Sequence, residues 1–264
     1  RERNGNKMRL ARRRQNQTLR RLAAFAAMIG LAATAAACSG GISEMTTAEV
    51  KDAAGMTQDE VEQLGPEGRF NLTGERYQRM QELMTEAQLQ VSNDEWGWGG
   101  GGFMPNSGST AYAPLPGATL NNSHYMDMTR IIHPEGAVGA VADARPVFDY
   151  FVSKGWEVAL TENDFSELEL EATHDFRVQA ITEDGYRVQY VLQQNGQYYF
   201  DVLTDTFWGD ADTIMNDQID RFGDDPLFPQ NLPETLSTEP GQSVPGVYTE
   251  YPKWEDPILQ KSEG

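Results

Sequence analysis

Residues 176–202 read FRVQAITEDGYRVQYVLQQNGQYYFDV, and the apolar side chains that alternate along this stretch stand at even-numbered positions. Strict alternation of apolar and polar residues is typical of strands with one buried face and one wet face. Three such runs follow one another and end at Ala180, Leu192 and Val202. The stretch therefore predicts three consecutive antiparallel strands.

The shared parity also predicts the turns between these strands. A hairpin that pairs even with even positions needs a loop with an odd number of residues, because a slip of one residue moves every side chain to the other face. Loops of three residues at Glu183-Asp184-Gly185 and Gln194-Asn195-Gly196 meet this condition. Both end in Gly, which suits the left-handed last position of such loops. A two-residue turn at Asn195-Gly196 would instead bury Asp201.

The same parity continues upstream, in residues 156–160 and 168–172. These runs predict two more strands. A third three-residue turn at Thr173-His174-Asp175 would join the second of them to the strand that begins at Phe176. In this register Glu171 lies opposite Arg177, a favourable cross-strand pair on the wet face. The expected sheet is an antiparallel meander of at least four strands.

The sequence also predicts helices and one more strand before and after the meander. Apolar residues spaced by three and four predict a first long helix over residues 74–91 and a second after Pro134, which Pro146 should kink or split. Residues 125–133 read as a strand, and residues 210–222 as a third helix. We expect an α+β fold in which two or three helices pack on one face of the sheet.

Four segments are expected along the chain. Residues 1–37 read as a cleaved signal peptide, residues 38–70 as a flexible tether, residues 71–222 as the α+β domain, and residues 223–264 as an extended proline-rich segment. Thr57-x-x-Glu60 within the tether matches a helix capping box. Seven of the thirteen prolines lie between 226 and 257. Two alternatives stay open for this segment: the parts around Tyr248 and Trp254 dock along the domain, or the proline-rich stretch is an exposed tail.

The leader has the three parts of a secretory signal peptide. Nine Lys/Arg and one Glu lie within residues 1–37, and residues 22–37 are sixteen uncharged, mostly apolar residues. A membrane-spanning helix needs about 20 such residues, so this run fits the shorter core of a signal peptide. A start at Met8 would give a leader of ordinary length.

Cys38 is the single cysteine, and it directly follows Ala35-Ala36-Ala37. This junction resembles the lipobox of bacterial lipoproteins, although Ala35 stands where most lipoboxes have Leu. The resemblance implies that Cys38 receives acyl chains, palmitate among them, and becomes the new N-terminus at the extracytoplasmic face of the cell membrane. The alternative is an ordinary secreted protein in which Cys38 is a free thiol.

Charge limits the class of partner. The chain has 21 basic and 40 acidic residues, so removal of residues 1–37 leaves 12 against 39 and a net charge of about −27. Such a surface repels phosphate backbones and anionic headgroups. We expect no nucleic-acid partner, and membrane attachment through acyl chains on Cys38. An envelope protein or glycan remains a candidate partner.

An aromatic, glycine-rich stretch follows the first long helix. Trp96, Trp98 and Phe103 surround four consecutive glycines, and aromatic rings in a loop can stack on a sugar or a peptide. These three residues are the candidate ligand-binding site. The favoured alternative is that the rings fold back and are buried in the domain.

No catalytic or metal motif accompanies these features. The three histidines have no metal-ligand spacing, and no nucleophile motif is present. We therefore expect no catalytic residue, metal or cofactor, and interpret the chain as a non-catalytic envelope binding or scaffolding module. Capture of a small ligand by the aromatic loop is one alternative, and an envelope hydrolase is another.

The order of several motifs resembles a known group of proteins. The lipobox is followed by Arg76-Tyr77, by MTRIIHPEG at residues 128–136, by DGYR at 184–187 and by a YPxWEDP ending at 251–257. This order resembles uncharacterised lipoproteins of high-GC Gram-positive bacteria and, more loosely, the LppA-type lipoproteins of mycobacteria. The resemblance implies a membrane-anchored extracytoplasmic protein, and only Cys38 can be assigned a role from it.

Overall fold

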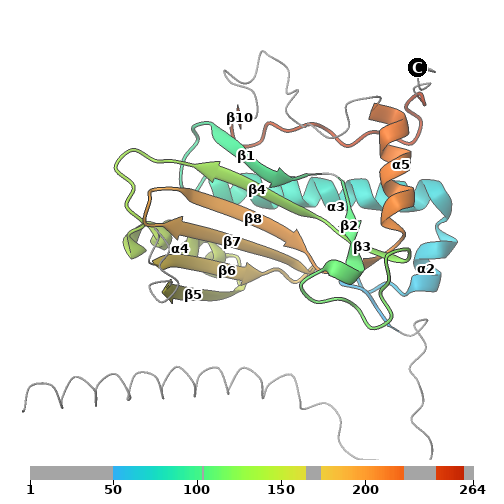
Figure 1. Ribbon diagram of the computed structural model, residues 1–264, viewed down its shortest axis with the longest axis horizontal. Helices are drawn as coiled ribbons and strands as arrows, with labels where there is room; N and C mark the ends of the chain where they lie inside the picture. Colours follow the sequence, from blue (N-terminus) through green and yellow to red (C-terminus); the bar gives the residue numbers. More distant parts are fainter. Residues whose placement is uncertain (1–49, 103, 165–173, 223–241, 259–264) are drawn as a thin grey trace, which may run out of the picture. The chain divides into compact units, whose positions relative to one another are not determined.

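The alternating stretch forms the centre of a seven-stranded antiparallel sheet in the computed structural model of the chain (Figure 1). The meander consists of β5 (Glu157–Asp164), β6 (His174–Ile181), β7 (Tyr186–Gln193) and β8 (Tyr198–Thr204). The structure describes residues 50–102, 104–164, 174–222 and 242–258, all within the compact unit Met45–Gly264. The fold is α+β, as the sequence predicts.

The register of the meander confirms the parity prediction. Val178 pairs with Tyr190, and Tyr190 pairs with Phe200, so even positions meet even positions across both hairpins. Both predicted three-residue loops form. The residues that flank them are hydrogen-bonded, the Thr182 N–H donating to the Tyr186 carbonyl and the Gln193 N–H donating to the Gln197 carbonyl.

The turn predicted at residues 173–175 is wrong. His174 and Asp175 belong to β6, where they pair with Asp164 and Asn163 of β5. Arg177 lies between Thr161 and Val191 rather than opposite Glu171. Residues 156–160 and 168–172 share one parity, so alternation could not decide which of them pairs with β6. Residues 165–173 lie outside the described part of the chain.

Three strands from distant parts of the sequence extend the sheet beyond β8. β4 (Asp127–Ile132) pairs with β8, β1 (Trp96–Gly101) pairs with β4, and β10 (Gln242–Ser243) pairs with β1. The predicted strand over residues 125–133 is split at Met126 into β3 and β4. A small sheet is formed by β2 (Asn106–Ser107), β3 (Ser123–Tyr125) and β9 (Phe207–Trp208).

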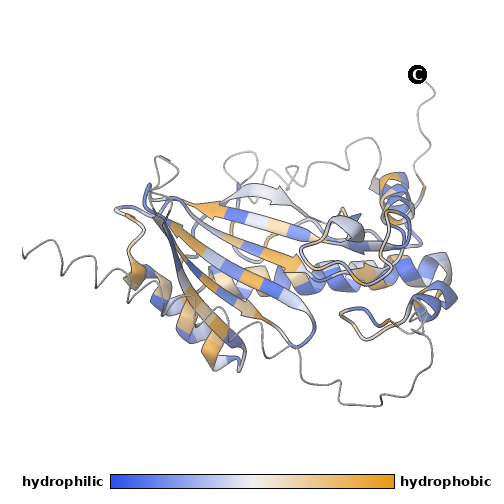
Figure 2. Ribbon diagram, turned by 60° about the horizontal axis from the view of Figure 1, so that its bottom comes forward, coloured by the Kyte–Doolittle hydropathy of each residue, from blue (hydrophilic) through white to orange (hydrophobic). Residues whose placement is uncertain are grey.

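Two helices cover the face of the large sheet that carries the even-numbered residues. α3 (Gly65–Gln88) and α4 (Arg145–Ser153) both lie behind the sheet in Figure 1. Figure 2 shows apolar and polar residues alternating along the strands. The core joins α3 and α4 to the even positions of the sheet, with fully buried side chains that include Met80, Met84, Phe151, Val188, Tyr190 and Phe200.

The folded part begins well before residue 71. α2 (Gln58–Gln63) starts with the predicted capping box, in which the Glu60 N–H donates to Thr57 Oγ1 and the Thr57 N–H donates to Glu60 Oε2. α3 starts at Gly65 rather than Gly74 because Pro66 lies in its first turn, where no N–H is needed. The predicted tether therefore extends too far, and its residues 38–49 lie outside the described part.

The C-terminal segment docks along the domain, which is one of the two alternatives that the sequence leaves open. Residues 242–258 run from β10 past α3 to α5 (Ala211–Phe222). Tyr251 and Trp254 pack on Phe70 of α3, with ring centroids 5.0 and 5.5 Å from the Phe70 ring. Residues 223–241 and 259–264 are not described.

Candidate functional site

Trp96 is a core residue and not a ligand-binding one, which corrects the prediction for this position. The glycine-rich stretch forms strand β1 instead of a loop, and Trp96 faces the helices with no exposed surface. Its ring lies 5.6 Å from the ring of Phe200, and its indole N–H donates to the Ser92 carbonyl. The alternative that the rings are buried is therefore right for Trp96.

Trp98 is partly exposed, unlike Trp96, although it lies only two residues further along the same strand. It is 36% exposed, and its indole N–H donates to the Gly101 carbonyl at 3.1 Å, which fixes the ring near the edge of the sheet. Its ring lines a cavity of about 690 Å³. Phe103 and Cys38, the other two predicted site residues, lie outside the described part of the chain.

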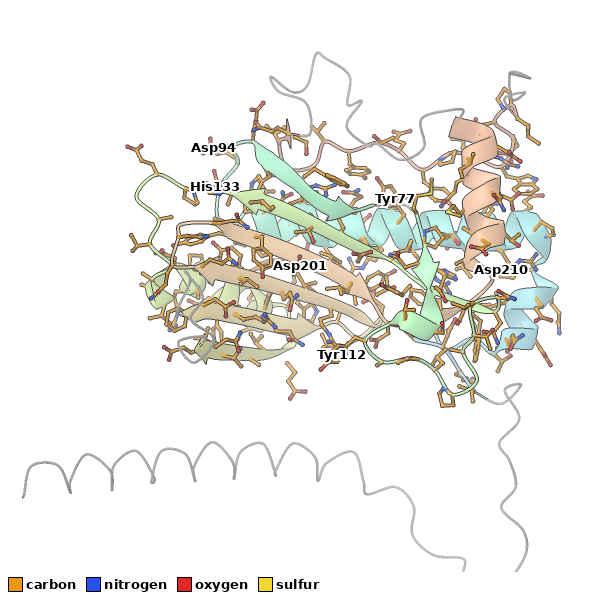
Figure 3. The ribbon with its side chains drawn as sticks, in the orientation of Figure 1. Tyr77, Asp94, Tyr112, His133, Asp201 and Asp210 are labelled. Atoms are coloured by element: carbon orange, nitrogen blue, oxygen red, sulfur yellow. The ribbon has the colours of Figure 1, made fainter. Side chains whose placement is uncertain are left out.

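The Trp98 cavity is built from four segments that meet at one end of the large sheet. The chain after α3 supplies Val91 to Glu95, β1 supplies Gly97 and Trp98, the end of β4 supplies Ile131 to Glu135, and the last wall is Gln242 of β10. Figure 3 labels Asp94 and His133 at this end of β1 and β4. A volume between about 300 and 1,000 Å³ is usual for small-ligand pockets.

Two glycines of β1 leave room for neighbouring groups, and the first of them lines the Trp98 cavity. Gly97 lies beside Trp98 and has no side chain to fill the space. At Gly99 a Cβ atom would lie only 2.6 Å from Thr129 Cγ2, so the side chains of β4 cross the strand at this point. The alternation of Trp and Gly thus puts the two rings on one face of β1, while side chains of β4 cover the other face at Gly99.

The polar lining of the Trp98 cavity is mainly acidic. Asp94, Glu95 and Glu135 contribute carboxylates, and the side chain of His133 lies among them. The turn that carries Asp94 is fixed by the hydroxyl of Ser92, which donates to the Asp94 carboxylate at 2.7 Å and accepts from the Asp94 N–H. An indole ring beside carboxylates can stack on a sugar ring and accept hydrogen bonds from its hydroxyls.

Sequence reasoning did not find these acidic residues. The segments that carry them are separated by more than thirty positions of chain, and β10 by more than a hundred. The signal that could have found them is the alternation Trp-Gly-Trp-Gly, which has the period of a strand. A strand at residues 96–101 would place Trp98 next to the end of the following strand.

The pKa of His124 is strongly shifted toward the neutral form, but the residue lies in the core. Burial, helped by the charge of Arg76, lowers the pKa of His124 to about 3. Its Nδ1 is 3.1 Å from the Gly209 carbonyl, so this nitrogen carries the proton in the neutral ring. The histidine is a structural residue of the small sheet.

Residues 210–225 contain six Asp residues. The first of them, Asp210, has a structural role. The Asp210 carboxylate accepts from the Asp212 N–H at 3.0 Å and from the Thr213 hydroxyl at 2.8 Å, and so caps the start of α5. Asp224 and Asp225 lie outside the described residues. Within the described part, no group of three or more His, Cys, Asp or Glu side chains is placed to hold a metal ion.

The comparisons with known proteins add no family to this description. No family model matches the chain, and searches of curated proteins and of solved structures find no match either. Among the described helices, none is both long enough and apolar enough to cross a membrane.

Proposed function

We propose that the protein is a non-catalytic lipoprotein, held at the extracytoplasmic face of the cell membrane by acyl chains on Cys38, whose α+β domain binds a component of the envelope. The observation that carries the anchor is the single cysteine placed directly after an uncharged run of sixteen residues. The order of motifs along the sequence, which resembles that of lipoproteins of high-GC Gram-positive bacteria, is in line with this proposal.

The acidity of the domain supports attachment through acyl chains. With a net charge of about −27 after residue 37, the domain is repelled by anionic lipids rather than attracted to them. Two or more acyl chains on one residue hold a protein stably, whereas one chain binds only marginally.

Metabolic labelling tests the anchor. Cells that express the full chain are fed an alkynyl analogue of palmitate, and the purified protein is examined for the label. We expect label on the wild type and none on Cys38→Ala, while Ser39→Ala, a neighbouring change that keeps the thiol, is labelled like the wild type. Equal labelling of wild type and Cys38→Ala would refute lipidation.

Capture of a small ligand is a second candidate, and the Trp98 cavity favours it. The cavity combines a part-exposed indole with three carboxylates, which suits a sugar or a short peptide better than an anion. This candidate now rests on Trp98 without Trp96.

The indole N–H signals of an NMR titration test this candidate. The trimer of N-acetylglucosamine serves as the sugar probe and trialanine as the peptide probe, and Trp98→Phe assigns the signal. We expect one probe to shift the Trp98 signal in a saturable way and to leave Trp208, which is buried and bonded to the Val50 carbonyl, unchanged. Trp98 and Trp208 signals that both stay constant would contradict capture of these ligand classes at the cavity.

A further inference from the structure

A second cavity lies beside α3, where the C-terminal segment packs on the helix. It has a volume of about 550 Å³ and is lined by residues of α3 and of residues 248–255. We call it the tyrosine cavity because Tyr77, Tyr248 and Tyr251 contribute its aromatic walls. Figure 3 labels Tyr77 on α3.

The wall formed by the C-terminal segment is held in place by hydrogen bonds from two helices. The Tyr77 hydroxyl donates to the Thr249 carbonyl at 2.7 Å. From α5, the Gln218 amide donates to the Tyr251 hydroxyl at 2.9 Å, and Arg221 Nε donates to the Trp254 carbonyl at 3.1 Å. The cavity is therefore formed before any ligand arrives, which lowers the entropy lost on binding.

A glycine in the middle of α3 brings the aromatic rings together. A Cβ atom at Gly74 would lie 2.7 Å from Cδ1 of Tyr251, so only glycine lets this ring lie against the helix. The ring of Tyr77 then lies 6.0 Å from that of Tyr251 and 6.2 Å, nearly perpendicular, from that of Tyr248. Tyr248 and Tyr251 are half-buried, so part of each ring is open to the cavity.

The polar lining of the tyrosine cavity carries an excess of negative charge. Glu75, Glu250 and Glu255 line it together with one cation, Lys253. The phenols of Tyr77 and Tyr251 stay neutral, because burial raises the pKa of Tyr77 to about 12 and also raises the pKa of Tyr251. The cavity thus presents neutral electron-rich rings beside carboxylates, within a chain whose overall charge is strongly negative.

This chemistry selects among ligand classes. Anions are repelled, and the described residues contain no cluster that could coordinate a metal ion. The hydroxyls of Tyr77 and Tyr251 already bond to Thr249, Gln81 and Gln218, so these two tyrosines offer ring faces rather than phenol groups to a ligand. Ring faces beside carboxylates favour an organic cation, because a cation is attracted to the face of an aromatic ring.

We propose that the tyrosine cavity is a binding site for a small organic ammonium ion, with Tyr248 and Tyr251 against the cation and Glu250 as its counter-charge. The site is separate from the Trp98 cavity, and its occupancy does not depend on the function proposed for that cavity. The same ammonium group occurs in free amines and in zwitterionic lipid headgroups.

NMR titration of the purified full-length chain with choline tests the proposal. The matched probe is 3,3-dimethylbutan-1-ol, which has the shape of choline without its charge. We expect saturable shifts around residues 74–78 and 248–255 with choline and at least about fivefold weaker binding of the neutral analogue. Phosphocholine separates the two sources: binding as tight as that of choline indicates a lipid headgroup, and weaker binding indicates a free amine.

Four variants assign the binding to this cavity. Tyr248→Ala should weaken choline binding at least about fivefold, while Tyr248→Phe, which keeps the ring, should stay within about twofold of the wild type. Glu250→Gln, at an exposed side chain that folding does not need, should weaken it about two- to threefold. Trp98→Ala should leave it unchanged.

Three outcomes would overturn the proposal. They are an absence of saturable choline binding, equal binding of choline and its neutral analogue, and loss of binding in Trp98→Ala with binding retained in Tyr248→Ala. Thermal unfolding of each variant checks its fold. If Tyr248→Ala does not fold, Glu250→Gln and the neutral analogue still decide the question.

Discussion

Asp52 joins the first described residues of the domain to the small sheet. Its side chain has no exposed surface, and its carboxylate accepts from the N–H groups of Ala54, Met56 and Trp208 at 2.9 to 3.2 Å. Arg76 lies 3.5 Å away, with its guanidinium 3.7 Å from the centre of the Phe207 ring. One carboxylate thus satisfies three backbone donors and one buried cation.

We expect Asp52→Ala to lower the free energy of unfolding by about 3 to 5 kcal/mol, because it leaves a buried cation and three donors without their acceptor. Urea unfolding followed by circular dichroism measures the change. Asp59→Ala removes an exposed carboxylate seven residues away and should change the free energy by less than about 1 kcal/mol. A similar small effect at Asp52 would show that water replaces the carboxylate.

His124 makes stability depend on pH. Its pKa is about 3 in the folded chain and 6.5 as the unperturbed value, so between these values the unfolded state binds more protons. The stabilising effect of the neutral ring is complete above about pH 6.5. It decreases as the pH falls toward 3, by up to about 1.4 kcal/mol per pH unit.

We therefore expect His124→Gln to flatten the decrease in stability between pH 6.5 and 4, measured as urea midpoints at several pH values. The variant will be less stable than the wild type at pH 7.5, because the buried ring packs against Phe207. Asn121→Gln, at an exposed position that does not titrate, is the control and should keep the slope of the wild type. An unchanged slope in His124→Gln would place the titrating group elsewhere.

At the scale of elements, the pairing of β1 with β4 depends more on Gly101 than on Gly100. Gly100 and Gly101 both have positive φ angles, +137° and +66°. A Cβ atom would meet nothing within 4 Å at Gly100, but at Gly101 it would lie 2.0 Å from the Asp127 carbonyl oxygen. Strain affects both positions, and only the second adds a clash with the backbone of β4.

We expect Gly101→Ala to destabilise the domain by at least about 1 kcal/mol more than Gly100→Ala, since overlap in a packed region adds about 1 to 3 kcal/mol. The difference between the two thermal unfolding curves measures the effect. Equal losses would mean that β1 moves away from β4 at low cost.

The elements also show which parts of the fold a single sequence predicts. β6, β7 and β8 follow from parity, because adjacent strands joined by short loops must match their buried faces. The partner of β6 on its other side did not follow, since residues 156–160 and 168–172 offer the same face to β6. β4 and β1 lie beyond β8 through contacts between distant segments, and local patterns carry no information about such pairings.

The residues of the Trp98 cavity likewise divide into one that the sequence indicated and others that only the folded structure brings together. Trp98 could be named from the sequence, because aromatic residues among glycines are unusual. Asp94, His133 and Glu135 could not, since they reach the Trp98 cavity only after β1 and β4 have paired. Trp96 was named as a candidate ligand-binding residue because the glycines were interpreted as a loop, although the alternation has the period of a strand. The favoured alternative, burial of the ring, holds for this residue.

At the scale of the whole molecule, the domain and its proposed anchor are close together in the chain. Eleven residues separate Cys38 from Val50, the first described residue, whose carbonyl accepts from the Trp208 indole N–H. Even a fully extended segment of this length spans at most about 40 Å. The proposed anchor therefore keeps the domain within that distance of the membrane, despite the repulsion between its acidic surface and anionic lipids.

This combination predicts how the protein behaves when membranes are washed. Because the proposed attachment comes from acyl chains and the domain carries about −27 charges, 1 M salt should release none of the wild type, and detergent should release all of it. Salt screens charge interactions but does not weaken the burial of acyl chains. Cys38→Ala should appear in the soluble or secreted fraction, and Ser39→Ala should remain with the membrane.

Mass spectrometry of each fraction completes this test. The membrane-bound wild type should have the mass of a chain that starts at Cys38 plus its acyl groups, and any membrane-bound Cys38→Ala should still carry residues 1–37. The second result would be due to the apolar run of the leader, which stays in the membrane when cleavage fails. Wild type released by salt, or a membrane-bound wild type without added acyl mass, would contradict the lipid anchor and leave surface contacts of the domain as the means of attachment.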